Sequence, residues 1–249
     1  MAMRSLEAPT TKAVILAGGL GARLRPLTNI MPKPLLPIGE STIIEVQLLA
    51  LKKHGVRDVY IATNYMHDYV VDALGKGERY GLNIVFSREA KRLGTCGPLT
   101  LLKDQLDAPF FMMNGDIITS IDFSALARFA SSKDADLTVV TKEINIPFRF
   151  GRVIADGDYI TDVEEKPDYK QEILAGIYAF RPSIFDLIPN DTYFGIDDLI
   201  KEMISKRLPI AKYLMSEYWV DIGQLDDYQI AKEMFGTQAA DQAANKPRG

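Results

Sequence analysis

The segment AVILAGGLGARLRPLTNIMPKPLLPIG, residues 13–39, joins an apolar run to three glycines, two arginines and a Pro-Lys-Pro sequence. The apolar run, residues 12–17, has the Val, Ile and Leu content of a buried strand. Glycines directly after a strand let the backbone approach a ligand closely, because they carry no Cβ atom. Glycines at such a place also serve in simple tight turns. The cations that follow favour an anion-binding loop at the carboxyl end of this strand.

The spacing of the glycines excludes two familiar phosphate loops. A dinucleotide-binding fingerprint requires a third glycine where Leu24 stands, and the Gly-Lys-Ser/Thr of a Walker A loop is missing. Arg23 supplies a planar, permanently charged donor that suits phosphate. Lys33 lies between Pro32 and Pro34, which place a second cation on a stiff, extended segment. We therefore expect a phosphate ligand held by backbone N–H groups and two cations.

Outward from this loop, strands and helices alternate along the first half of the chain. Further strands are predicted at residues 58–63, 82–87 and 109–116. This alternation predicts right-handed βαβ units around a mainly parallel sheet. After residue 143 the pattern changes to a hairpin with Asp156-Gly157 at its turn, followed by a strand at residues 173–180. We expect this second half to elaborate the same sheet.

Helix boundaries follow from capping residues. The first predicted helix begins after Ser41 as its N-cap and ends at Gly55, and Glu45 lies one residue too far from Ser41 for a capping box. Residues 97–106 are also predicted to be helical. Residues 1–11 are expected to be a flexible N-terminus, and residues 237–249 a disordered tail or a weak terminal helix.

Composition excludes several classes of protein. The chain has 249 residues, 47% of them hydrophobic and 25% charged, as in ordinary globular proteins. Its net charge of −4 argues against a general nucleic-acid-binding protein. One cysteine and two histidines exclude an internal disulfide and a cysteine-based zinc cluster. No apolar run reaches the length of about 18 residues that a spanning helix needs, and residues 1–11 lack the apolar stretch of a secretory leader. We expect a cytoplasmic protein without a membrane or nucleic-acid partner.

Two aspartates follow predicted strands that lie far apart in the sequence. Asp116 ends the Asn-Gly-Asp sequence of residues 114–116, where it would face the same edge of the sheet as the glycine loop. Asp221 ends a short strand in the sequence WVDIG, residues 219–223. Asn-Gly-Asp is also an ordinary turn sequence. Two such carboxylates nevertheless fit Mg²⁺, a hard cation that prefers oxygen ligands and bridges to substrate phosphates.

The sequence from residue 16 to residue 39 closely resembles the signature of the sugar-1-phosphate nucleotidyltransferases, L-A-G-G-x-G-T-R-L-x-P-L-T-x-x-x-P-K-P-L-x-P. Ala22 stands where the family usually has threonine. The resemblance extends over roughly residues 12–235. It implies an α/β, Rossmann-like three-layer α/β/α fold with a mainly parallel central sheet and a smaller sugar-binding β elaboration. It divides a single domain, residues 12–236, into a nucleotide-binding part, residues 12–143, and a sugar-phosphate-binding part, residues 144–236.

The resemblance also implies a role for each matching residue. Arg23, Lys33 and Asp116 would be catalytic, and Asp116 and Asp221 would hold Mg²⁺. Glu165 would accept hydrogen bonds from sugar hydroxyls and Lys166 would contact the sugar phosphate, although Glu-Glu-Lys-Pro is also typical of a solvated charge run. The nucleotide-binding residues are expected to be Leu16, Ala17, Gly18, Gly19, Gly21, Glu89, Gly94, Thr95, Asn114 and Gly115. The sugar-phosphate-binding residues are expected to be Gly151, Glu165, Lys166, Gly176 and Trp219.

The sequence LGTCG, residues 93–97, bears on the base. Leu-Gly-Thr-Ala-Gly after Ser-x-Glu, here Ser87 and Glu89, is similar to the guanylyltransferases for mannose 1-phosphate and related sugars. Cys96 replaces the alanine, and we interpret it as a packing residue. Leu174 replaces a frequent asparagine, which leaves the sugar open. The expected partners are a nucleoside triphosphate, with GTP favoured, a sugar 1-phosphate, and a second copy in a homodimer. The alternatives are a cytidylyl-, uridylyl- or thymidylyltransferase, and a non-catalytic regulatory subunit that binds a nucleotide sugar.

Overall fold

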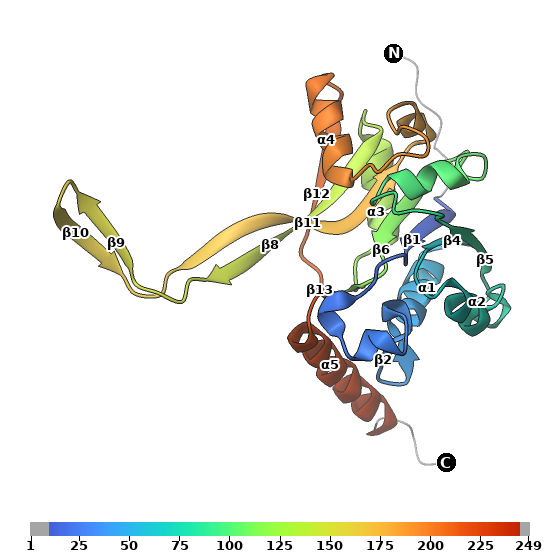
Figure 1. The fold of residues 1–249 in the computed structure, drawn as a ribbon, viewed down its shortest axis with the longest axis horizontal. Coiled ribbons are helices and arrows are strands. Elements are labelled where there is room, and N and C mark those ends of the chain that lie inside the picture. The colour runs from blue at the N-terminus through green and yellow to red at the C-terminus, as the bar shows by residue number, and fades with distance from the viewer. Residues whose placement is uncertain (1–9, 245–249) are drawn as a thin grey trace.

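The centre of the molecule is a seven-stranded sheet with strand order β12-β8-β11-β6-β1-β4-β5 (Figure 1). The computed structural model describes residues 10–244, with side chains described up to residue 235. Most of the flexible N-terminus predicted at residues 1–11 therefore lies outside the described residues. The sheet strands are β1 (Lys12–Leu16), β4 (Asp58–Thr63), β5 (Asn83–Arg88), β6 (Phe110–Asn114), β8 (Leu137–Pro147), β11 (Asp168–Phe180) and β12 (Ile210–Met215).

The pairing confirms the predicted, mainly parallel α/β sheet. Strand β1 is parallel to both neighbours, β4 and β6, and β12 is parallel to β8. Strand β11 is antiparallel to β6 and β8. The chain adds β4 and β5 on one side of β1 and then returns to place β6 on the other side. This reversal creates a switch point at the carboxyl ends of β1 and β6, where open α/β sheets bind their ligands.

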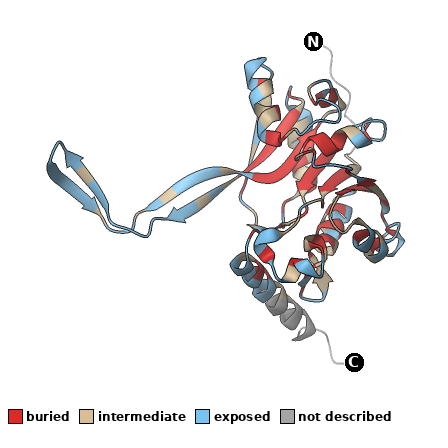
Figure 2. Cartoon of the chain, in the orientation of Figure 1, coloured by how far each residue is buried: buried red, intermediate tan, exposed pale blue. Residues whose placement is uncertain are grey.

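Helices cover both faces of the sheet and produce the three expected layers. Along β1, Ala13 and Ile15 pack into one core cluster with Leu48 of α1, while Val14 packs into another with Leu199 of α4. Successive side chains of a strand point to opposite faces, so β1 is buried on both sides (Figure 2). The α-helices are α1 (Ile43–Lys53), α2 (His67–Leu74), α3 (Phe123–Ser132), α4 (Ile196–Ser205) and α5 (Leu225–Ala244). Among residues 10–244, no helix combines the length and apolar character needed to cross a bilayer.

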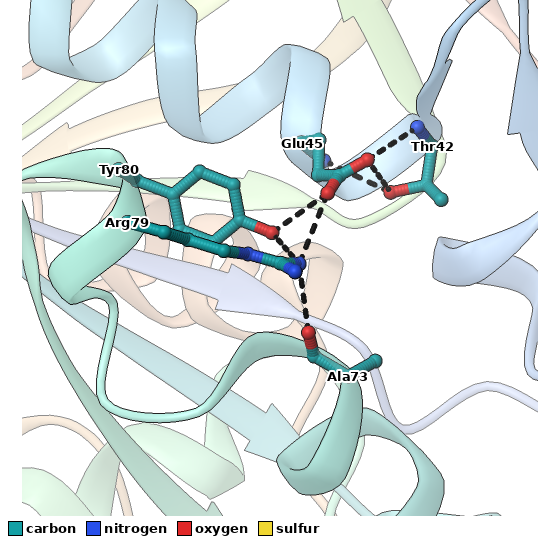
Figure 3. Close-up of polar contacts among 5 residues, drawn as sticks. All are labelled: Thr42, Glu45, Ala73, Arg79 and Tyr80. Carbon is teal, nitrogen blue, oxygen red and sulfur yellow. Dashed lines mark hydrogen bonds and ion pairs between the residues drawn. The ribbon is translucent and has the colours of Figure 1, made fainter.

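The N-cap of α1 is Thr42, and the expectation of Ser41 was wrong. Ser41 belongs to a short strand, β3 (Ser41–Thr42), which pairs with β2 (Pro37–Ile38). From Thr42, Glu45 is at the correct position for a capping box: its Oε2 accepts from Thr42 N at 2.8 Å, and Glu45 N donates to Thr42 Oγ1 at 3.4 Å (Figure 3). The hydroxyl of Tyr80 donates to Glu45 Oε1 at 2.7 Å, which ties the start of α1 to a distant turn.

The structure decides two other local predictions. The helix predicted at residues 97–106 is a 3-10 helix, Gly97–Leu102, in which Thr100 Oγ1 donates to the carbonyl of Gly97 at 2.7 Å. Of the two alternatives for the tail, the described part adopts the helix, because α5 continues to Ala244 through an Ala- and Gln-rich sequence with high helix propensity. The other 3-10 helices are Ala22–Leu24, Leu27–Asn29, Lys33–Leu35, Glu78–Tyr80 and Pro182–Asp186.

A long two-stranded ribbon leaves the carboxyl edge of the sheet (Figure 1). Beyond Lys142, β8 pairs with β11 alone, and the ribbon continues into the hairpin of β9 (Arg152–Asp156) and β10 (Tyr159–Glu164). The predicted turn at residues 156 and 157 is confirmed, with Gly157 at φ 55°. We call residues 143–172 the β-arm. The border expected between the two functional parts, residues 143 and 144, falls inside β8.

Candidate functional site

The glycine loop opens onto a cleft of about 590 Å³ at the switch point of the sheet. The loop follows β1, and Asn114 and Asp116 reach the same cleft from the end of β6. Most of the nucleotide-binding residues expected from the sequence therefore lie together. The expected residues that line the cleft are Leu16, Gly18, Gly19, Gly21, Glu89, Gly94, Thr95, Asn114 and Asp116. Ala17 and Gly115 lie beneath it: Ala17 is buried, and Gly115 N donates to the carbonyl of Leu16 at 2.9 Å.

Neighbouring atoms closely approach two glycines of the site, and at Gly115 the neighbour is a backbone atom that cannot move aside. A Cβ atom on Gly115 would lie 2.5 Å from the carbonyl oxygen of Leu16, and one on Gly18 would lie 2.9 Å from Glu89 Oε1. A Cβ atom on Gly19 would meet no other atom within 4 Å, so the backbone of Gly19 faces open space. The loop thus presents an uncovered backbone to the cleft, as a phosphate cradle requires.

Lys33 and Asp116 form an ion pair, with Lys33 Nζ 2.6 Å from Asp116 Oδ2. Lys33 is held at this place by the short 3-10 helix Lys33–Leu35, which follows Pro32 in extended conformation. The Lys33 side chain is only 11% exposed. The second oxygen of Asp116, Oδ1, is buried without a hydrogen-bond partner. One oxygen of this carboxylate is therefore neutralised while the other still needs a partner.

The short strand β13 (Trp219–Asp221) brings the second aspartate to the first. It pairs antiparallel with β7 (Ile117–Thr119), so that Asp221 lies opposite Ile117, and Ile222 N donates to the carbonyl of Asp116 at 2.9 Å. Burial raises the pKa of the Asp221 carboxyl, and the negative charge of Asp116 raises it further, while Lys33 and Arg23 lower it. The four charged residues predicted to do the chemistry therefore act on one another at one place.

The donor set of this cluster fits a divalent metal ion with hard-oxygen preference. Asp116 offers its unpartnered Oδ1. The negative charges of Asp116 and Asp221 repel each other, and a bound cation would relieve this repulsion. Among residues 10–244 no group of three or more His, Cys, Asp or Glu side chains gathers for a metal ion. Two carboxylates would suit Mg²⁺, because this ion keeps water and substrate phosphate among its ligands.

The LGTCG segment lies on the other side of the cleft, next to Glu89. Leu93 N donates to Glu89 Oε2 at 2.9 Å, and burial raises the pKa of the Glu89 carboxyl. Thr95 Oγ1 accepts from Ile196 N at 2.6 Å, so its hydroxyl also supports the start of α4. Cys96 is fully buried in the core, and burial raises the pKa of its thiol to about 12. The interpretation of Cys96 as a packing residue is confirmed.

The residues expected to bind the sugar phosphate divide into two groups. Gly176 and Trp219 lie by the cleft: a Cβ on Gly176 would be 2.7 Å from Asn114 Nδ2, and Trp219 Nε1 donates to the carbonyl of Ala175 at 2.8 Å. The group on the β-arm comprises Gly151, Glu165 and Lys166. All three are exposed, Glu165 Oε1 and Lys166 Nζ are 3.6 Å apart, and none lines the cleft.

Sequence reasoning missed several residues of the cleft. Asn64 comes directly after β4, so the rule that ligands lie at strand ends could have found it, and its Nδ2 donates to the Glu89 carbonyl at 3.1 Å. Tyr193 arrives from a distant loop, and no local pattern marked it. The missed residues that line the cleft are Leu20, Ala22, Asn64, Arg92, Pro98 and Tyr193.

The sheet is doubly wound, and its switch point carries an open glycine loop, two cations and two carboxylates. These features are typical of α/β proteins that bind nucleotide phosphates. The nucleotidyl transferase family model matches residues 12–237, and the chain belongs to this family. Members of the family generally use a divalent metal ion.

Curated relatives and a solved structure are similar over most of the chain. The mannose-1-phosphate guanyltransferases of Schizosaccharomyces pombe and Yarrowia lipolytica are 38% and 36% identical over 87% of this chain. The match spans 62% of the length of those relatives. The crystal structure of HddC from Yersinia pseudotuberculosis complexed with GMP-PN has a TM-score of 0.71 and 27% identity, and covers 91% of this chain and 100% of that one.

Proposed function

We propose that the protein transfers a guanylyl group from GTP to a sugar 1-phosphate and releases pyrophosphate. The observation that carries the proposal is the cluster of Lys33, Asp116, Asp221 and Arg23 beside an open glycine loop. The names of the relatives favour mannose 1-phosphate or a related sugar as the acceptor. The guanine nucleotide analogue in the HddC structure and the LGTCG segment favour guanine.

The reaction joins two anions, so the site must neutralise charge and hold geometry. The backbone of Gly18, Gly19 and Gly21 would bind the triphosphate, and Arg23 and Lys33 would stabilise the negative charge on the departing pyrophosphate. A Mg²⁺ ion held by Asp116 and Asp221 would neutralise the phosphate oxygens further. The sugar phosphate oxygen then attacks the α-phosphorus in line with the leaving group. This direct displacement needs no covalent enzyme intermediate, in agreement with a buried Cys96.

Glu89 offers a physical basis for the choice of base. Its Oε1 faces Gly18 in the cleft, and its other oxygen is already held by Leu93 N. Guanine presents N–H donors on its base-pairing edge, which a carboxylate can accept. A cytidylyl-, uridylyl- or thymidylyltransferase is the alternative enzyme, and a non-catalytic sensor of nucleotide sugars is the alternative class. The cluster of Arg23, Lys33, Asp116 and Asp221 favours the enzyme.

A pyrophosphate-release assay with Mg²⁺ tests the proposal. GTP, ATP, CTP, UTP and dTTP are each combined with a panel of sugar 1-phosphates, and Lys33→Ala serves as the inactive control. Release with GTP and one sugar supports the proposal and identifies the acceptor. Release with another base identifies one of the alternative enzymes. Binding of a nucleotide sugar with no release across the panel contradicts the enzyme and favours the sensor.

Three expectations stay predictions beside this proposal. They are the cytoplasmic location, the homodimer, and the single domain divided between nucleotide and sugar phosphate at residues 143 and 144. The position of the border within β8 means that the sugar part begins inside a strand whose first residues belong to the central sheet.

A further inference from the structure

The β-arm exposes an unusual amount of apolar side chain. Phe150 is 71% exposed, Tyr159 is 80% exposed and Ile160 is 66% exposed. A single exposed apolar residue needs no explanation, but a contiguous set on one extended element marks an interaction surface. Figure 2 shows the arm standing clear of the core with exposed residues along its length. The large exposed apolar residues of the arm are Ile146, Phe148, Phe150, Val153, Tyr159, Ile160 and Val163.

The β-arm is held in an extended form by its own pairing. The ladder between β8 and β11 is continuous from the pair Thr141–Leu174 to the pair Pro147–Asp168. Phe148 then packs against Phe150 and Tyr169, with ring centroids 5.9 Å and 6.0 Å apart, where the ribbon meets the hairpin. Lys142 is the last residue of β8 that pairs with β12, and Phe148, six residues further on, donates its N–H to the carbonyl of Pro167. At a rise of about 3.3 Å per residue, the neighbouring Glu165 and Lys166 therefore lie about 20 Å along the ribbon beyond the edge of the sheet.

This extension leaves the site of a single chain without part of its predicted machinery. The cleft contains the glycine loop and the charged cluster, but no residue of the β-arm lines it. Strand β8 runs parallel to β6, so the arm leaves from the same carboxyl edge at which the cleft opens. An arm from another molecule, arriving at that edge, could therefore bring Glu165 and Lys166 to the cleft.

Exposed apolar and basic residues lie close in sequence to Arg23 and Lys33 of the charged cluster. Ile30 is 76% exposed and Met31 is 38% exposed, three and two residues before Lys33. Arg92, which lines the cleft, and Arg25, two residues after Arg23, are both exposed and add positive charge. The β-arm has eight carboxylate side chains and four cationic ones, so its net charge of −4 is opposite in sign to these arginines. An apolar, acidic ribbon is complementary to a segment that exposes apolar and basic side chains.

We propose that two copies of this chain exchange their β-arms, so that each arm packs on the rim of the partner's cleft and presents Glu165 and Lys166 to the sugar 1-phosphate bound there. The role of these two residues rests on the proposed function, whereas the exchange itself does not. A second copy suits the arm because a symmetric exchange buries the exposed apolar residues of both arms at once. An arm that folds back on its own cleft would have to bend its continuous ladder.

Sedimentation of the full-length protein tests the exchange. The wild type is expected to be a dimer at micromolar concentration, and the double variant Tyr159→Asp/Ile160→Asp a monomer with an unchanged far-UV spectrum. Both positions are exposed, so the core is not perturbed. Leu49→Asp, at a 49% exposed position on α1, is the matched control and is expected to stay dimeric. A monomeric wild type, or a double variant that stays dimeric, overturns the proposal.

Complementation tests which cleft receives each arm. Lys33→Ala and Lys166→Ala chains with two different tags are co-expressed, and the mixed dimer is purified through both tags. Exchange unites the intact core of one chain with the intact arm of the other in one of the two sites, so about half of the wild-type activity is expected. A mixed dimer as inactive as its parents means that each arm serves its own cleft, which overturns the exchange. A wild type inactive with every substrate contradicts the proposed function, and sedimentation still reports the exchange.

Discussion

Replacing Lys33 by methionine removes the cation of the central ion pair and keeps most of the apolar stem. Lys33 Nζ lies 2.6 Å from Asp116 Oδ2, and the two side chains are 11% and 28% exposed. Opposite unit charges about 4 Å apart attract by about 4 kcal/mol at an effective dielectric constant of 20. The desolvation of Lys33 offsets part of this attraction, and hydrogen bonds to charged groups contribute about 1.5–3 kcal/mol net. We therefore expect Lys33→Met to lower the free energy of unfolding by about 2 kcal/mol.

The same change should have a pH and metal signature. Without Lys33, the pKa of Asp221 rises further above its usual value, because one of the two cations that lower it is gone. A carboxyl whose pKa is raised in the folded state contributes stability below its unfolded pKa and loses it as the pH rises through the folded value. The deficit of the variant should therefore shrink below about pH 4 and grow toward pH 7. Added Mg²⁺ should stabilise the variant at pH 7, since it replaces the lost positive charge.

Urea unfolding from pH 4 to pH 8, with and without Mg²⁺, measures these effects, and pyrophosphate release measures the fall in turnover. Lys91→Met is the matched control, because the Lys91–Asp191 pair has a similar length of 2.9 Å but is 57% and 82% exposed. We expect that control to cost less than about 1 kcal/mol. Equal effects of the two substitutions on stability, or a fall of less than about tenfold in turnover for Lys33→Met, would refute the assignment of Lys33 to the charged cluster.

Three further predictions concern other parts of the site and fold. Gly115→Ala should lower the free energy of unfolding by about 2–4 kcal/mol in thermal unfolding, because its Cβ would lie 2.5 Å from the Leu16 carbonyl oxygen. Gly19→Ala is the control and should lower it by less than about 1 kcal/mol, so equal effects of the two substitutions would contradict the close packing at Gly115. Asp221→Asn should abolish the stabilisation by Mg²⁺, and an unchanged Mg²⁺ response would remove Asp221 from the metal site. In the wild type, the stabilisation by Mg²⁺ should be lost on acidification at a higher pH than for an ordinary aspartate, because the pKa of Asp221 is raised. Glu45→Ala should lower the free energy of unfolding in urea by about 1–2 kcal/mol through loss of the capping box. Burial raises the pKa of Glu45, but hydrogen bonds from Tyr80 and Thr42 outweigh it and lower this pKa, so the stability difference between wild type and variant should disappear as the pH falls through the lowered value. A constant stability difference down to about pH 2 would exclude the carboxylate as its source.

Local patterns were sufficient where a structural feature depends on neighbours in the sequence. The apolar run before the glycine loop predicted β1, and Asp156-Gly157 predicted the turn of the hairpin. The position of Lys33 between two prolines predicted a cation held near the loop. The error at Ser41 was of one residue, because a two-residue strand, β3, occupies the place that the serine would take as a cap. Such a strand exists only through its pairing with β2, which the local pattern does not contain.

The sequence by itself determined the α/β class, the place of the glycine loop after the first strand, and the identity of the four charged residues. Each depends on residue type and spacing, which set backbone conformation and charge directly. Only the tertiary structure decided that β13 pairs with β7 and so sets Asp221 beside Asp116. It alone decided that Glu165 and Lys166 lie on an extended β-arm. The reason is that non-local strand pairing, together with the register shift between Leu174 and Tyr178, sets where the ribbon leaves the sheet, and no local pattern encodes that geometry.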